Sequence, residues 1–319
     1  MSVGDVMFKA GGYSRTWLHQ IGGWFRRRNN RLISGHIQKR RISHSSKGSF
    51  EKTIRSGQPF VAGKIGTAEL LALEFHDRRI RIPCLGLGWR RSARRLATNA
   101  GFFPLSKRAF VRWNVIMRKA ISQMDFICAW QGDEFLKTYE SRLIASLNPK
   151  ATIVGLESVG MSMLPEIASS RWLVISPFVD SMRAQLPRLG EVHHNSARQG
   201  IDWKKISKNC RFLRCPLHWH LAASPFSSWK EGLDRLAEAA AVEDFDVALI
   251  GAGAWSLPLA ARIKQTGRSA IHTGGETQLI FGIRGKRWDD YNFYNSAWIS
   301  PSPEETPQAN QKIDDGCYW

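Results

Sequence analysis

Two pairs of glycines stand where main-chain amides could hold a phosphate. Gly251 and Gly253 follow one apolar run, and Gly274 and Gly275 follow the next. Amides at the start of a helix point toward their ligand and carry partial positive charge, so turns of this kind suit a phosphorylated molecule. Tight packing of a strand against a helix explains the same glycines, and the sequence leaves both interpretations open.

The turn at Gly251 differs from a dinucleotide-binding turn in two respects. Ser256 occupies the place of the third glycine of that fingerprint. About 20 residues further on, where such proteins carry an acidic residue for the ribose, this chain has Ala270, Ile271 and His272. We therefore expect no NAD at this turn.

Ionisable side chains surround the second turn. His272 ends the apolar run before it, and the basic residues Lys286 and Arg287 follow one helix further on. Arginine and lysine bind phosphate oxygens through charge-assisted hydrogen bonds, so this basic pair predicts a clamp for a pyrophosphate. A solvated surface run is the alternative for the pair, and a hydrogen-bonded structural histidine is the alternative for His272.

These turns need parallel strands to position them. The clearest unit is a strand over 244–250, a helix over 256–265 that Gly267 ends, and a strand over 269–272. The same alternation begins after residue 57 and is typical of an α/β protein, so we predict a Rossmann-like open, mostly parallel sheet with helices on both faces. Other predicted elements are strands at 59–64, 151–156, 172–176 and 212–215, and helices from about 65 to 75 and over 229–241.

Positive charge is concentrated in two segments. The chain carries 46 Lys and Arg against 27 Asp and Glu, a formal net charge of +19. Residues 1–55 hold twelve basic and two acidic residues, and residues 78–119 hold twelve basic residues and no acidic one. The rest of the chain is slightly acidic. Two local patches suit an anionic membrane surface or a phosphorylated ligand better than a nucleic acid, which is the less favoured partner.

The first 55 residues are predicted to form a basic extension. Within 14–41, tryptophans and leucines recur near helical spacing beside arginines, which is typical of a helix that lies on an anionic membrane surface. A mobile, solvated tail is the alternative for this segment. We place the folded domain at 56–300 and a polar C-terminal tail at 301–319.

Neither the cysteines nor the histidines predict a metal site. The five cysteines are scattered without a CxxC pair, and the histidine pairs at 193–194 and 218–220 lack a third ligand at suitable spacing, so we expect no zinc.

No apolar run reaches the roughly 18 residues that a membrane span needs. The N-terminus lacks the apolar core of a signal peptide. We expect a cytoplasmic protein that could bind peripherally to the inner face of the cell membrane.

A longer pattern resembles a known family. The run 248–288, with its glycine turns and Gln278, is similar to the C-terminal half of bacterial GT-D-type glycosyltransferase-like proteins. Further likeness lies at 100–104, 177–185 and 316–319. The resemblance implies a Rossmann-like glycosyltransferase that moves a sugar from a nucleotide sugar, typically a UDP-sugar, to a surface-glycan or lipid-linked acceptor.

The resemblance also implies roles for the first strand-to-helix turn. Members of the family carry an Asp-x-Glu motif there for a divalent metal and the nucleotide, and this chain has Thr67 and Glu69 after Gly66. Glu69 is the implied ligand of Mn²⁺ or Mg²⁺, but the threonine removes one carboxylate. Three outcomes stay open: a weaker metal site, a metal-free site in which arginines neutralise the diphosphate, and an inactive relative.

Together these residues predict one crevice at the carboxyl edge of the sheet. Glu69, Asp180 and His272 are the catalytic candidates, with Asp180 as the leading base. The nucleotide sugar is expected at Gly66, Thr67, Gly251, Gly253, Gly274, Gly275, Gln278, Lys286 and Arg287. The alternative functions are a catalytically degenerate relative that binds a sugar nucleotide or a partner, and a basic nucleic-acid-binding protein.

Overall fold

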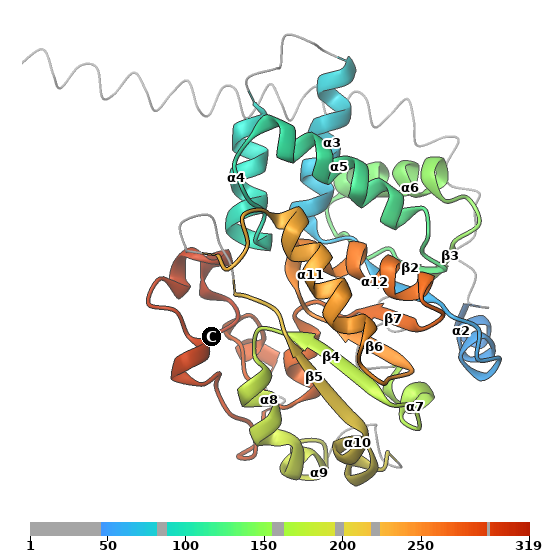
Figure 1. Ribbon diagram of the computed structural model, residues 1–319, viewed down its shortest axis with the longest axis vertical. Coiled ribbons are helices and arrows are strands. Elements are labelled where there is room, and N and C mark those ends of the chain that lie inside the picture. The colour runs from blue at the N-terminus through green and yellow to red at the C-terminus, as the bar shows by residue number, and fades with distance from the viewer. Residues whose placement is uncertain (1–45, 82–87, 155–162, 195–200, 218–223, 292–293) are drawn as a thin grey trace, which may run out of the picture.

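A computed structural model describes residues 46–81, 88–154, 163–194, 201–217, 224–291 and 294–319 (Figure 1). Over these residues the chain is an α/β protein built on one open sheet of seven strands, all parallel. The predicted Rossmann-like parallel sheet is therefore confirmed. The predicted amphipathic segment 14–41, His218 and His220 lie outside the described residues.

The strands lie side by side in the order β3-β2-β1-β7-β6-β4-β5. They are β1 Val61–Lys64, β2 Phe126–Cys128, β3 Thr152–Val154, β4 Trp172–Ser176, β5 Cys210–Arg214, β6 Val247–Ile250 and β7 Ser269–His272. Strand β7 lies between β1 and β6, and Gly63 of β1 is in register with His272 of β7. The last strand of the chain is thus at the centre of the sheet.

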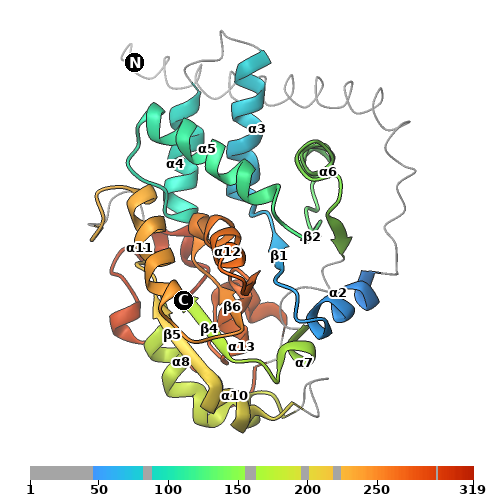
Figure 2. The same ribbon diagram turned by 45° about the vertical axis from the view of Figure 1, so that its right-hand side comes forward.

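Helices cover both faces of the sheet (Figures 1 and 2). They are α2 Ser46–Arg55, α3 Thr67–Arg81, α4 Trp89–Ala100, α5 Lys107–Ile121, α6 Glu134–Leu147, α7 Leu164–Ile167, α8 Val179–Gln185, α9 Leu189–Val192, α10 Trp203–Asn209, α11 Trp229–Ala241, α12 Ser256–Gln265 and α13 Glu276–Ile280. Along β4, Leu173 and Ile175 belong to one buried cluster and Trp172 and Val174 to another, because successive side chains of a strand point to opposite faces. Helices α3, α4, α5, α6, α11 and α12 pack in the first cluster, and α2, α7, α8, α9, α10 and α13 in the second.

This arrangement places a crevice at the carboxyl ends of the central strands. After β1 and β6 the chain continues into α3 and α12, which lie on the face of the sheet that the first cluster covers. After β4 and β7 it continues into α8 and α13, which lie on the face that the second cluster covers. Neighbouring strands whose connections go to opposite faces leave an opening between their carboxyl ends, where open α/β sheets bind ligands. The order of strands therefore predicts the position of the site.

Several elements have the bounds that the sequence pattern predicts. Helices α11 and α12 and strand β7 start and end at the expected residues, and Gly267 follows α12 with a φ of 82° that favours glycine. The pattern does not predict α4, whose buried face is made largely of alanines in an arginine-rich segment. Small buried residues give a weak periodic signal, which explains the omission.

Described residues before 56 and after 300 pack on the body of the protein. Phe50 of α2 packs on Phe60 and Phe126, with ring centroids 5.4 and 4.8 Å apart. Residues 301–319 form 3₁₀ turns that pack on the body, where Ile313 is buried. Within the described ranges, none of the helices has the length and apolar character required to cross a bilayer.

Candidate functional site

A cleft of about 400 Å³ lies at the carboxyl ends of β1, β4, β6 and β7. The turns after these strands, the end of α4 and the C-terminal residues 313, 314 and 318 line it. The predicted site residues in this lining are Gly66, Thr67, Glu69, Gly251, Gly253, His272, Gly274, Gly275, Gln278 and Arg287. Asp180 and Lys286 are described residues that do not line the cleft.

Glu69 folds back over the first turn of α3. A Cβ added to Gly66 would overlap Oε2 of Glu69, so the carboxylate keeps this position only while residue 66 is glycine. Burial, together with the nearby charge of Asp314, raises the pKa of Glu69 to about 7. The carboxyl group is therefore able to release or accept a proton close to neutral pH.

His272 presents a neutral imidazole to the cleft. Its Nδ1 lies 2.8 Å from the carbonyl oxygen of Lys64, and because a carbonyl only accepts, Nδ1 carries the hydrogen. Burial and the positive charge of Lys64 lower the pKa of His272 to about 4. Since the lining of the cleft includes His272, its unprotonated Nε2 is available as an acceptor for a bound hydroxyl group.

Three side-chain cations and three carboxylates line the described part of the cleft. The Nζ of Lys64 lies 2.9 Å from Oε1 of Glu276, and Nη2 of Arg287 lies 2.7 Å from Oδ2 of Asp314. The third cation, Arg95, comes from the exposed face of α4 and has no acidic partner among the described residues. The third carboxylate is the buried Glu69.

The glycine turns of β6 and β7 are in contact with each other. A Cβ on Gly251 would lie 2.5 Å from Oγ1 of Thr277 and 2.7 Å from the carbonyl oxygen of Gly274. Gly253 has a φ of 53°, and a Cβ there would lie 2.6 Å from the carbonyl oxygen of Ala100. These glycines are therefore required by the packing of the turns, in agreement with the packing interpretation of the sequence, and they also line the cleft.

The amide nitrogen of Gln278 has two main-chain partners, the carbonyl oxygens of Tyr318 and of Arg284 (3.5 Å), and its oxygen has none. Its Nε2 donates to the carbonyl oxygen of Tyr318 at 2.9 Å, which identifies that atom as the nitrogen. Oε1 is buried without a hydrogen-bond partner, although the residue lines the cleft. A buried acceptor without a donor is costly, so a ligand that supplies an N–H or O–H group here would be favoured.

Four further residues of the lining were not predicted from the sequence. Lys64, Arg95 and Trp130 line the cleft, and so does Tyr318, whose ring lies 4.4 Å from the guanidinium of Arg287. The acid-free segment 78–119 was a signal for Arg95. Lys64 is the last residue of β1 and Trp130 lies two residues after β2, so their positions at strand ends are the signal for them.

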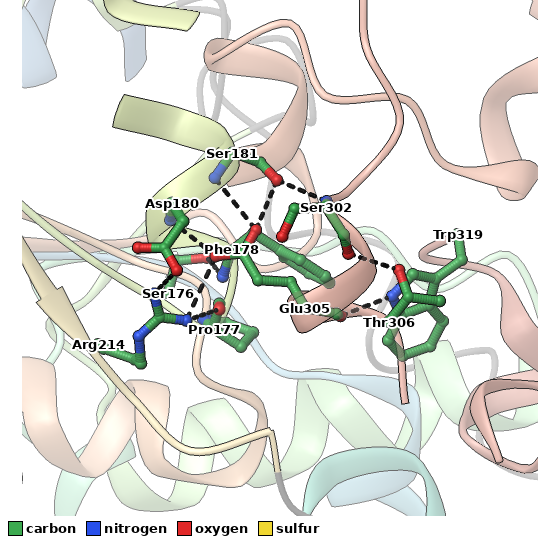
Figure 3. A network of polar contacts seen from close by, with 10 residues as sticks. All are labelled: Ser176, Pro177, Phe178, Asp180, Ser181, Arg214, Ser302, Glu305, Thr306 and Trp319. Atoms are coloured by element: carbon green, nitrogen blue, oxygen red, sulfur yellow. Dashed lines mark hydrogen bonds and ion pairs between the residues drawn. The ribbon is translucent and has the colours of Figure 1, made fainter. Parts of the chain in front are cut away.

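Asp180 belongs to a separate polar network (Figure 3). Its side chain is about half exposed and pairs with Arg214, and its main-chain N–H donates to Oε1 of Glu305 at 2.7 Å. The Glu305 side chain is only 1% exposed, and it also accepts hydrogen bonds from the main chain and hydroxyl of Ser181. Trp319 donates from Nε1 to the carbonyl oxygen of Glu305 at 3.0 Å. This network therefore fastens the C-terminal segment to the start of α8.

The residues of the cleft do not fit a protein-held Mn²⁺ or Mg²⁺. No three His, Cys, Asp or Glu side chains gather in the described part of the chain as a metal site would require. At the first turn, Thr67 donates from Oγ1 to Oε1 of Gln131 at 3.3 Å in place of a carboxylate ligand. At this turn Glu69 alone remains as a carboxylate ligand.

Comparisons with known proteins give no relative: no family model, no curated protein and no solved structure matches the chain.

Proposed function

We propose that the protein is a glycosyltransferase that binds a nucleotide sugar, of the UDP-sugar class, in the cleft at the ends of β1, β6 and β7. The observation that carries the proposal is the combination of side-chain cations with unprotonated, uncharged acceptors in one cleft. A nucleotide sugar has a matching pair of features, because its diphosphate is anionic and its sugar and ribose carry hydroxyl groups. The resemblance to GT-D-type proteins supports the same class of donor.

The diphosphate would lie near Arg95, Arg287 and Lys64. Arginine binds phosphate oxygens with two parallel hydrogen bonds, and Arg95 has no acidic partner that competes for it among the described residues. As the bond between the anomeric carbon and the diphosphate oxygen breaks, these cations offset the charge that develops on the leaving group. In this proposal, side chains take the role that a metal ion serves in the family.

Hydroxyl groups of the ligand would pair with His272 and Gln278. Nε2 of His272 is an acceptor at any pH above about 4, the value to which burial lowers its pKa. When the acceptor oxygen bonds to the anomeric carbon, His272 Nε2 takes the proton from that oxygen and the nucleoside diphosphate leaves. The position of Asp180 in the network around Glu305 makes His272 the better candidate for the base.

The proposal is tested by titrating the full chain with a panel of nucleotide sugars in a calorimeter, with and without Mn²⁺. We expect binding of at least one UDP-sugar without the metal, and release of UDP when a lipid-linked or glycan acceptor is added. If no nucleotide sugar binds under either condition, the proposal is wrong.

A degenerate relative that binds a sugar nucleotide without turnover is a second candidate, and Thr67 is the observation that favours it. Thr67 stands where the family has aspartate, and its hydroxyl is bonded to Gln131. The variant Thr67→Asp restores the carboxylate. Nucleotide release by this variant, with none by the unaltered chain, would support the second candidate over the first.

A further inference from the structure

Helices α4 and α5 present a large set of exposed cations. Those on α4 are Arg90, Arg91, Arg94 and Arg95, and those on α5 are Lys107, Arg108, Arg112 and Lys119. They belong to the segment 78–119, which has no acidic residue. We call these eight residues the α4–α5 cationic surface.

The cations of this surface lack acidic partners within the described part of the chain. Neighbouring basic residues do have them, since Arg118 pairs with Asp77 and Arg78 pairs with Glu74. None of the eight forms an ion pair with a described residue. Like charges that repel one another lower stability unless a ligand compensates for them, so the surface suits an anionic partner.

An apolar side chain lies within the cationic stripe of α5. Arg108, Arg112, Val115 and Lys119 follow one another at intervals of four, three and four residues, which places them on one side of the helix. Val115 is 61% exposed, and Leu105 just before α5 is 39% exposed. A cationic helix face that includes exposed aliphatic side chains is typical of a surface that contacts lipid headgroups and the outer part of the acyl region.

The surface lies beside the cleft. Helices α4 and α5 are at one end of the molecule, and α10 is at the opposite end (Figures 1 and 2). Arg95 belongs both to the α4–α5 cationic surface and to the lining of the cleft. A partner held on this surface would therefore be close to any ligand in the cleft.

We infer that the α4–α5 cationic surface docks on an anionic lipid bilayer. The aliphatic side chains favour lipid over nucleic acid, because single-stranded nucleic acid needs exposed aromatic rings for stacking. Tyr291, far along the chain, is the one aromatic residue among the exposed large hydrophobic residues of the described chain. Arg95 alone is shared between this surface and the proposed reaction, and the inference does not depend on that reaction.

The test compares two charge-matched variants of the full chain. One removes three cations of the surface that do not line the cleft: Arg108→Gln, Arg112→Gln and Lys119→Gln. The control removes three exposed lysines of α10, at the other end of the molecule: Lys204→Gln, Lys205→Gln and Lys208→Gln. Binding is measured by co-sedimentation with phosphatidylcholine vesicles, with and without phosphatidylglycerol. Binding of a DNA duplex and a single-stranded RNA is measured in parallel.

We expect binding to the anionic vesicles only, and a loss of affinity on the order of 100-fold in the α5 variant, since each cation near an anionic bilayer contributes about 1 kcal/mol. The α10 variant should bind the vesicles like the unaltered chain. Equal losses in both variants, no loss in the α5 variant, or no vesicle binding at all would overturn the inference. So would a loss of nucleic-acid binding in the α5 variant with vesicle binding unchanged. Nucleotide-sugar binding, measured on the same variants, tests the proposed function separately.

Discussion

The Nδ1 hydrogen of His272 is donated to the main-chain carbonyl oxygen of Lys64, and these two residues end neighbouring parallel strands. The contact is possible because Gly63 has no side chain, since a Cβ there would lie 2.7 Å from the Cβ of His272. It holds the imidazole in one tautomer and aligns the ends of β1 and β7. This hydrogen bond and the parallel ladders of β7 with β1 and β6 together hold the floor of the cleft.

The first prediction concerns the stability of the protein in acid. Because the pKa of His272 is lowered from 6.5 to about 4, the unfolded chain takes up a proton between these values and the folded chain does not. The contribution of His272 to the free energy of unfolding therefore decreases by roughly 3 kcal/mol as the pH falls from 6.5 to 4. In urea unfolding at several pH values, His272→Asn should lack this decrease. An equal decrease in the variant would contradict the prediction.

The second prediction concerns Glu69, whose contribution to stability changes with pH in the opposite direction to that of His272. The pKa of Glu69 is raised from 4.5 to about 7, so its protonated form stabilises the fold below pH 4.5 and this contribution is lost as the pH rises toward 7. Glu69→Gln mimics the protonated carboxyl at every pH. Above pH 7 the variant should be more stable than the unaltered chain by roughly 3 kcal/mol, and near pH 4 the two should be alike. Urea unfolding at both pH values measures the difference.

The third prediction concerns the space over Gly66. Gly66→Ala would displace the carboxylate of Glu69, and a displacement of about 1 Å in a binding site can reduce function on the order of 100-fold. We expect the affinity for a UDP-sugar, measured by calorimetry, to fall at least tenfold. Gly132→Ala is the control, because a Cβ there would meet nothing within 4 Å. Similar losses in both variants would show that Gly66 has no special role.

The fourth prediction compares the contributions of two adjacent cations, Arg287 and Lys286, to the binding of UDP. Arg287 lines the cleft, whereas Lys286 is exposed outside it. Arg287→Gln should lower the affinity for UDP by about tenfold or more, since a charge-assisted hydrogen bond contributes about 1.5–3 kcal/mol. Lys286→Gln should change it less than about twofold, as an exposed charge is screened by water and salt. A loss of equal size in the two variants would argue against a direct role of Arg287.

The fifth prediction concerns the buried carboxylate of Glu305. Glu305→Gln replaces one carboxylate oxygen by an NH₂ group, so that either the main-chain N–H of Asp180 or the two donors of Ser181 lose their acceptor. We expect the free energy of unfolding to fall by about 2–4 kcal/mol, because buried donors and the guanidinium of Arg214 lose their acceptor. The adjacent Glu304 is exposed, so Glu304→Gln should change stability by less than about 0.5 kcal/mol. Equal effects would mean that the network contributes little.

The sequence predicts the parallel sheet, and the edge of the sheet at which the site lies, because both depend on local patterns. The apolar run before Gly251 and the helix that Gly267 ends are visible within a window of about 20 residues. Once the strands are known to be parallel, the turns at Gly66, Gly251 and Gly274 must lie at one edge of the sheet. Nine of the ten predicted site residues that line the cleft lie at or just after these strand ends, and Arg287 follows one helix later.

The remaining contacts depend on residues that are far apart in the sequence. Glu305 lies 125 residues from Asp180, and its insertion at the start of α8 leaves no local pattern. Gln278 and Tyr318 are 40 residues apart, and their hydrogen bond holds the C-terminal segment at the cleft. Polar segments such as 301–319 resemble solvated tails unless their partners are known, so packing of this kind could not be predicted from the sequence.

The central position of β7 has a consequence for synthesis on the ribosome. Strand β7 is the last to be made, and it alone joins the group β3-β2-β1 to the group β6-β4-β5. The main-chain N–H of Phe60 donates to the hydroxyl of Ser269, a residue that is synthesised 209 residues later. Until then the nascent chain has two unpaired strand edges, which are prone to aggregation. The presence of a chaperone during synthesis should therefore raise the yield of folded protein, and truncation before residue 269 should abolish it.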